Sequence, residues 1–211
     1  MRKMTMLCLL AALLMIGTQA GFTFSGLKDF MASGRELAHA ELIGALLIAG
    51  FGTLISLFPF HSWAAPAYAS APAPVAMMHA GVLKKFGLYG LFMFQPLMET
   101  GFLPWTNILL VLLVCNVIWV GYVTVNQKRL DLLLGNSSVM HMGYIFLAFA
   151  ALVVSGSAEA NPWALKGAAL LMLAHGLTIA LLFLLCGQIE KQTGTLEINS
   201  LGGLSTRLPR M

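Results

Sequence analysis

Two adjacent lysines and two histidines are the residues of this sequence best suited to proton chemistry. Lys84 and Lys85 fall midway along an apolar stretch, and His141 and His175 lie within two later ones. Removal from water favours the neutral form of a lysine, so a buried lysine can load and release a proton near neutral pH. Imidazole is the side chain whose ordinary pKa suits a proton relay. These residues therefore predict parts of a proton path, with a packing hydrogen bond as the alternative for each histidine.

Lys84 and Lys85 cannot share one environment, because neighbouring residues on a helix point about 100° apart. We expect one ammonium group to face the interior of a helix bundle and the other to meet a different partner. The alternative is that both side chains extend to an interface. Their central position in the apolar stretch argues against it.

The remaining polar residues are weaker candidates. His61 adjoins prolines at a helix end and is expected to be structural, and His79 is not favoured as a proton-path residue. Asp131 and Glu190 fall at predicted interfaces, where solvation is expected. One helix face is predicted to form a polar stripe of Ser137, Ser138, His141 and Tyr144. The sequence has no glycine-rich phosphate loop, HExxH motif or CxxC pair. Any redox or hydrolytic chemistry is therefore expected in another subunit.

The elements that must position these side chains are membrane helices. Apolar residues make up 59% of the 211-residue chain and charged residues 9%, against roughly 25% charged residues in a soluble domain. The apolar residues fall in runs near the ~20 residues that cross a bilayer, and such runs must be helical because lipid offers the backbone no hydrogen bonds. The net charge of +4 is scattered at segment ends, which argues against a nucleic-acid partner. The sequence therefore predicts an all-α integral membrane fold, one domain over residues 1–211.

Six membrane spans are predicted, at about residues 4–23, 39–59, 73–94, 105–126, 134–155 and 164–187. Prolines from Pro59 to Pro74 interrupt the bundle after the second span, because proline ends one helix and is well placed in the first turn of the next. The charged connection 24–38 is expected to be solvated. The first span also has the layout of a secretory signal, but a first spanning helix is the simpler interpretation.

Basic residues indicate the orientation. With six spans, both termini and the second and fourth connections share one side, which collects Arg2, Lys3, Lys128, Arg129, Lys191, Arg207 and Arg210. The opposite side has Lys28 and Arg35, with Lys166 just inside the sixth span. Lys and Arg accumulate in cytoplasmic loops, so both termini are predicted to be cytoplasmic.

A series of motifs in a specific order resembles a known family. The motifs are FPFHSW at 58–63, AP at 71–72, AGVLKKFGLYG at 80–90, SSVMHMG at 137–143, AHGL at 174–177, CGQ at 186–188 and LGGL at 201–204. From about Leu42 onward the chain resembles the antiporter-like subunits of respiratory complex I, and among them the M subunit of NADH-quinone oxidoreductase.

The resemblance implies a proton-translocating module with broken helices and a hydrated axis. It implies Lys85 as the proton-loading lysine in the middle of the module, and His141 and His175 as relay groups; Lys84 is a candidate substitute for a lysine lost elsewhere. It implies no cofactor in this chain, with NADH, FMN, iron–sulfur clusters and quinone in other subunits. The implied partners are other membrane subunits of complex I and the lipid bilayer, in the inner (plasma) membrane of a bacterium.

Departures from the family pattern keep other functions open. Leu54 stands where the family carries a buried lysine, and AAPAY at 64–68 replaces LPDAH, so that an acid and a histidine are missing. Complete members are also longer, and the chain is expected to be a fragment, a split-gene product or a truncated relative of their middle part. The alternatives are a subunit of a Mrp-type cation/proton antiporter or membrane-bound hydrogenase, and a degenerate scaffold that moves no protons.

Overall fold

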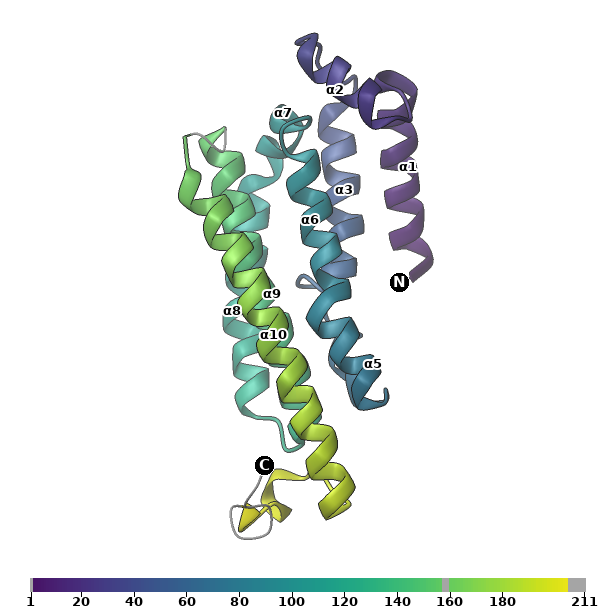
Figure 1. Ribbon diagram of the computed structural model, residues 1–211. Helices are drawn as coiled ribbons and strands as arrows, with labels where there is room; N and C mark the ends of the chain where they lie inside the picture. The colour runs from purple at the N-terminus through teal and green to yellow at the C-terminus, as the bar shows by residue number, and fades with distance from the viewer. Residues whose placement is uncertain (1, 157–159, 205–211) are drawn as a thin grey trace.

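The protein is a bundle of helices, seen here in a computed structural model that describes residues 2–156 and 160–204 (Figure 1). The longer helices are α1 (Arg2–Ala20), α2 (Phe24–Ala32), α3 (Ala40–Ile55), α6 (Lys84–Phe94), α8 (Thr106–Val125), α9 (Leu130–Ser155) and α10 (Pro162–Thr193). The shorter elements are α4 (Ala64–Ala69), α5 (Ala73–Met78), a π-helical turn (His79–Leu83), α7 (Glu99–Phe102) and two 3₁₀ turns, Leu103–Trp105 and Ile198–Ser200. The prediction of an all-α fold is confirmed.

Three helical stretches in the described part of the chain are long and apolar enough to cross a membrane: Thr100–Val125, Leu130–Ser155 and Pro162–Thr193. A fourth is counted if Thr5–Ala20 and Phe24–Ala32, which meet at 63°, form one span. The apolar helix α3 is shorter, and the stretch from α5 to α6 is interrupted by the π turn. The prediction of six spans therefore goes beyond what length and hydropathy establish in the structure.

Two groups of helices pack against each other. Helices α8, α9 and α10 lie side by side, and α1 packs on α3, which in turn packs on α6 (Figure 1). Phe149 of α9 packs edge-on against Phe92 of α6 and Phe102 of α7, with ring centroids 5.6 and 5.2 Å apart. Such aromatic pairs add to the gain from burying the rings, so these contacts join the two groups.

The helices of the structure do not coincide with the predicted spans at every point. The connection 24–38 contains α2, whose first turn is capped by the Thr23 hydroxyl accepting from the Gly26 N–H at 3.1 Å. Helix α10 continues past residue 187 to Thr193, where Gly194 ends it in the left-handed conformation with φ 73°. Hydropathy marks only the membrane-buried part of a helix. The capping residues decide where the helix begins and ends.

The chain breaks after α3, as the run of prolines predicted. Ser56 adopts a left-handed conformation, with φ 69°, and the backbone then turns through residues 57–63 into α4. Asn116 of α8 holds this break in place. Its side chain accepts from the Phe58 N–H at 3.2 Å and donates to the Val139 carbonyl at 3.1 Å, and it is fully buried. One amide therefore ties the break to α8 and α9.

Replacing Asn116 with leucine should destabilise the protein by about 1–3 kcal/mol, because the Phe58 N–H then loses its partner in a buried site. Heat-induced unfolding of the purified protein in detergent measures the loss. The matched control is Asn126→Leu at the exposed end of the same helix, where the amide bonds only the preceding turn; its effect should stay within about 0.5 kcal/mol. Equal stability of the two variants would contradict a structural role for Asn116.

Candidate functional site

A π-helical turn positions the two lysines. In this turn the Lys84 N–H donates to the His79 carbonyl, five residues back rather than four. Such single π turns inside helices occur frequently at functional sites. Helix α10 reaches this turn where two glycines meet: a Cβ on Gly176 would lie 2.8 Å from the Gly81 carbonyl oxygen. The close approach places residue 175 of α10 beside the first turn of α6.

Lys85 and His175 are in hydrogen-bond contact across that approach. The Lys85 Nζ lies 3.0 Å from the His175 Nδ1, and it also donates to the Ala80 carbonyl in the π turn. A charged lysine has only donors to offer, so His175 Nδ1 is the acceptor whenever Lys85 is protonated. After proton transfer the roles reverse, and the neutral amine accepts from the imidazole. The pair can therefore exchange a proton without rearranging.

His141 of α9 extends the pair into a row of three side chains. The rings of His141 and His175 have centroids 5.1 Å apart. The Nδ1 of His141 lies 2.8 Å from the Ser137 carbonyl, which can only accept, so Nδ1 carries the proton of the neutral ring. Its Nε2 is then the nitrogen that can take up a further proton. Lys85, His175 and His141 come from three different helices, and the structure brings together the three residues that the sequence favoured.

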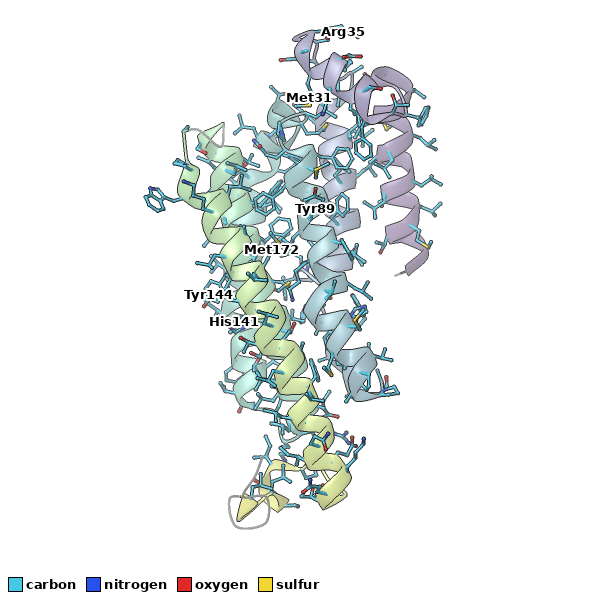
Figure 2. The ribbon with its side chains drawn as sticks, viewed as in Figure 1. Met31, Arg35, Tyr89, His141, Tyr144 and Met172 are labelled. Atoms are coloured by element: carbon cyan, nitrogen blue, oxygen red, sulfur yellow. The ribbon has the colours of Figure 1, made fainter. Side chains whose placement is uncertain are left out.

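The predicted polar stripe on α9 is wrong as a single face. Ser138 is fully buried, whereas Tyr144 is 43% exposed, so the two point to different surroundings. His141 and Tyr144 lie at mid-height of the bundle (Figure 2), with ring centroids 6.2 Å apart. Ser138 lies about 100° around the helix from Ser137 and about 120° from Tyr144, so it does not share their face.

Lys84 has different surroundings from Lys85, as their adjacency predicted. It is fully buried, and its Nζ lies 5.1 Å from the ring centroid of Tyr68 and 6.0 Å from that of Trp63. Both aromatic residues belong to the segment after the break in α3.

Leu54, at the position where the family pattern has a lysine, lines a cavity rather than the packed core. It is 37% exposed. The cavity has a volume of about 360 Å³ and is lined by Thr5, Met6, Thr53, Leu54, Trp63, Ala67 and His79. Leu54 therefore borders an open space together with Trp63 and His79.

Asp131 is buried and paired, which corrects the expectation that it is solvated. It forms an ion pair with Arg129, whose Nη2 lies 2.7 Å from Oδ2, and it also accepts from the Leu132 N–H at 2.8 Å. The hydrogen bond and the charge of Asp131 raise the pKa of Arg129 above its ordinary value. Arg129 is therefore charged at all physiological pH values, and Asp131 belongs to the anchoring of α9 rather than to the row of three.

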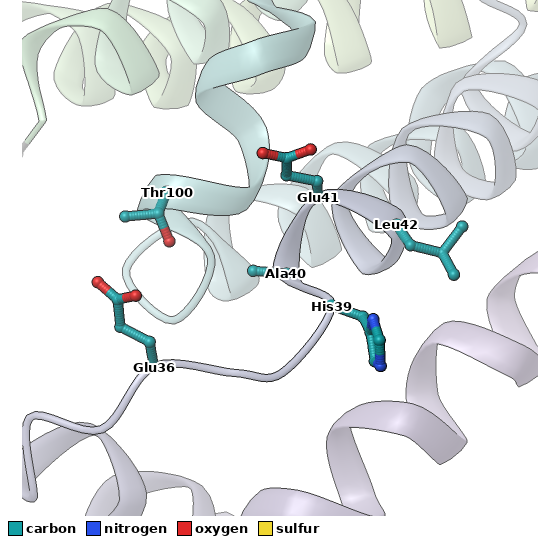
Figure 3. Close-up of a pocket in the computed structure, with 6 residues that line it drawn as sticks. All are labelled: Glu36, His39, Ala40, Glu41, Leu42 and Thr100. Carbon is teal, nitrogen blue, oxygen red and sulfur yellow. The ribbon is translucent and has the colours of Figure 1, made fainter.

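A second hollow, of about 450 Å³, lies at the start of α3 (Figure 3). Glu36, Glu41 and Thr100 surround it, while the His39 imidazole points to another side. The two carboxylates are exposed, as expected where a chain leaves the membrane. Among the described residues no group of His, Cys, Asp and Glu could hold a metal ion.

The chain belongs to the family described as "NADH:quinone oxidoreductase/Mrp antiporter, TM", which matches residues 2–211. It is 35% identical over 187 residues to NAD(P)H-quinone oxidoreductase chain 4 2 of Microcystis aeruginosa, covering 88% of this chain and 32% of that protein. It is 36% identical over 185 residues to chain 4-2 of Synechocystis sp., covering 87% and 31%. The chain therefore spans about a third of the length of these relatives.

Two solved membrane complexes contain chains with the same fold. A chain of respiratory complex I from Thermus thermophilus with bound NADH superimposes with a TM-score of 0.79 at 28% identity, over 96% of this chain and 42% of that one. A chain of the membrane-bound sulfane sulfur reductase, an archaeal respiratory membrane complex, gives a TM-score of 0.79 at 23% identity, over 97% and 41%. The resemblance to antiporter-like subunits is confirmed, and the protein is a membrane protein of this family.

Proposed function

We propose that this chain forms part of an M-type membrane subunit of a bacterial proton-translocating NADH-quinone oxidoreductase. In this proposal Lys85, His175 and His141 carry protons within the membrane. The contact of 3.0 Å between Lys85 Nζ and His175 Nδ1 supports it most strongly. Ionisable side chains are costly to place inside a membrane bundle, and those that occur there commonly belong to proton or ion pathways. The chemistry of the reaction with NADH lies outside this chain, in subunits that hold NADH, FMN, iron–sulfur clusters and quinone.

The proposed location is the inner membrane of a bacterium, with both termini in the cytoplasm. The basic residues before α9 and near the end of α10 support this orientation, since they lie on one side of the membrane if the chain crosses it six times. The proposed partners are other membrane subunits of the complex. Exposed apolar side chains along α8 and α10, among them Trp119, Leu170 and Leu177, offer a surface for them or for lipid.

Purification of the tagged chain from its host membranes tests the proposal. We expect NADH-driven quinone reduction to copurify with the chain, and deletion of its reading frame to abolish proton translocation driven by NADH. Copurification of the chain with cation/proton antiporter or hydrogenase activity instead would assign it to the other branch of the family. Unchanged translocation after deletion would favour a scaffold that moves no protons.

A further inference from the structure

Lys84 is a fully buried titratable side chain that the row of three does not use. It adjoins Lys85 in sequence, but its side chain contacts the segment after the break in α3 rather than α10. Among the described residues its Nζ has no hydrogen-bond partner. The one ion pair among the residues that the structure describes joins Arg129 and Asp131. No described carboxylate therefore balances the Lys84 charge. An unpaired buried ammonium is costly, and its presence requires an explanation.

Two aromatic rings lie beside this ammonium, and a third ring packs on both of them. Together Trp63, Tyr68 and His79 form what we term the aromatic box. The faces of Trp63 and Tyr68 attract a cation within about 6 Å of the ring centroid, which matches the distances to Lys84 Nζ. His79 lies edge-on to both rings, at 5.7 and 5.4 Å, and its Nδ1 is 3.3 Å from the Tyr68 hydroxyl. The box therefore stabilises the charged form of Lys84 without fixing it in an ion pair.

The aromatic box also borders the cavity at Leu54. Trp63 and His79 line that cavity, and Tyr68 connects His79 to the Lys84 side of the box. The imidazole and the phenol are both groups that can accept one proton and donate another. A hydrogen bond thus joins His79 at the cavity to Tyr68, and the ring of Tyr68 lies against the Lys84 ammonium.

The charge of Lys84 interacts with three other titratable groups. Its charge interacts with that of Lys85, and it also acts on His61 and His175. Positive charges on neighbouring groups repel, so the protonation states of Lys84 and Lys85 are coupled. The two lysines occupy separate environments, one joined to the row of three and one to the aromatic box.

We propose that Lys84 is a second proton-holding site, which exchanges protons with the cavity at Leu54 through His79 and Tyr68. This inference rests on the proposed function. In the net step His79 takes up a proton from the cavity, and the resulting imidazolium passes a proton to the Tyr68 oxygen. The original Tyr68 hydroxyl proton goes to the Lys84 amine when Nζ moves from the ring face to the hydroxyl, and the amine becomes an ammonium. His79 and Tyr68 return to their neutral forms. Release runs in reverse or toward Lys85.

The test is proton translocation per NADH oxidised, measured in membrane vesicles that contain the assembled complex with Lys84→Arg or Lys84→Met. Arginine keeps the positive charge and the attraction to the aromatic rings but does not release its proton. We expect both variants to lower translocation by about threefold or more, since a positioned proton-transfer group contributes at least that much. Native gels check that the complex assembles, and Lys85→Ala is measured alongside.

Translocation at the parent level in Lys84→Arg would overturn the inference, because Lys84 would then be a structural cation. If Lys85→Ala fails and both Lys84 variants are normal, the proposed function stands and the inference falls. If none of these variants lowers translocation, the proposed function itself is contradicted. If the complex does not assemble with the Lys84 variants, Tyr68→Phe tests the inference instead. This variant keeps the aromatic ring and removes the hydroxyl that bonds His79. Translocation at the parent level in Tyr68→Phe would overturn the inference.

Discussion

Replacing Lys85 with alanine is expected to lower proton pumping and NADH-driven quinone reduction together, by about tenfold or more. The variant removes the partner of His175 Nδ1 and the donor to the Ala80 carbonyl. In a coupled enzyme, electron transfer slows when protons cannot be loaded. Both rates should be measured on the same vesicles, with the amount of assembled complex determined for each variant.

The matched control for this prediction is Lys166→Ala. Lys166 is an exposed lysine beside the exposed ring of Trp163, so its loss should leave both rates unchanged. Lys85→Arg serves as a second comparison, because arginine keeps the charge but does not exchange its proton. Pumping at the parent level in Lys85→Ala would remove Lys85 from the mechanism.

A leucine at position 176 is expected to abolish pumping by separating His175 from Lys85. A Cβ there would meet the Gly81 carbonyl at 2.8 Å, and the carbonyl is backbone that cannot move aside cheaply. Helix α10 must therefore shift away from the π turn. Overpacking of this kind costs about 1–3 kcal/mol or more, and the displaced His175 loses its 3.0 Å contact.

Gly167→Leu is the control on the same helix, because a Cβ at that position meets nothing within 4 Å. Both variants are compared by thermal stability of the purified protein and by proton pumping. We expect Gly176→Leu to have lower thermal stability than the parent and no proton pumping. We expect Gly167→Leu to match the parent in both measurements. Equal behaviour of the two leucine variants would show that the close approach of α10 to the π turn has no functional importance.

Ionisable groups are rare in apolar stretches, which marked the two adjacent lysines, His141 and His175 as candidates. The resemblance to the antiporter-like family then singled out Lys85 from its neighbour. Their contacts could not be predicted in the same way. The exchange geometry depends on a π turn and on Gly81 meeting Gly176, and hydropathy carries no signal for either. The two glycines in apolar helices were the available sign, since glycine in a helix interior often marks a close approach.

The range 73–94 was predicted as one span, and the structure has helix over those residues with the π turn inside it. Asp131 shows where reasoning from position fails. Its place near a predicted interface suggested solvation, but Arg129, two residues earlier, folds back and pairs with it. Whether such a charge is buried depends on the local path of the chain, which the apolar pattern does not determine.

The most direct test of the account is a double-variant measurement of proton translocation per NADH oxidised, with Lys85→Ala, His175→Gln and both together. If the two residues act on one path, each single variant lowers translocation, and the double variant is no worse than the more severe single one. Normal translocation in the single variants would contradict the account. So would losses that add in full in the double variant, because they would place Lys85 and His175 on independent paths.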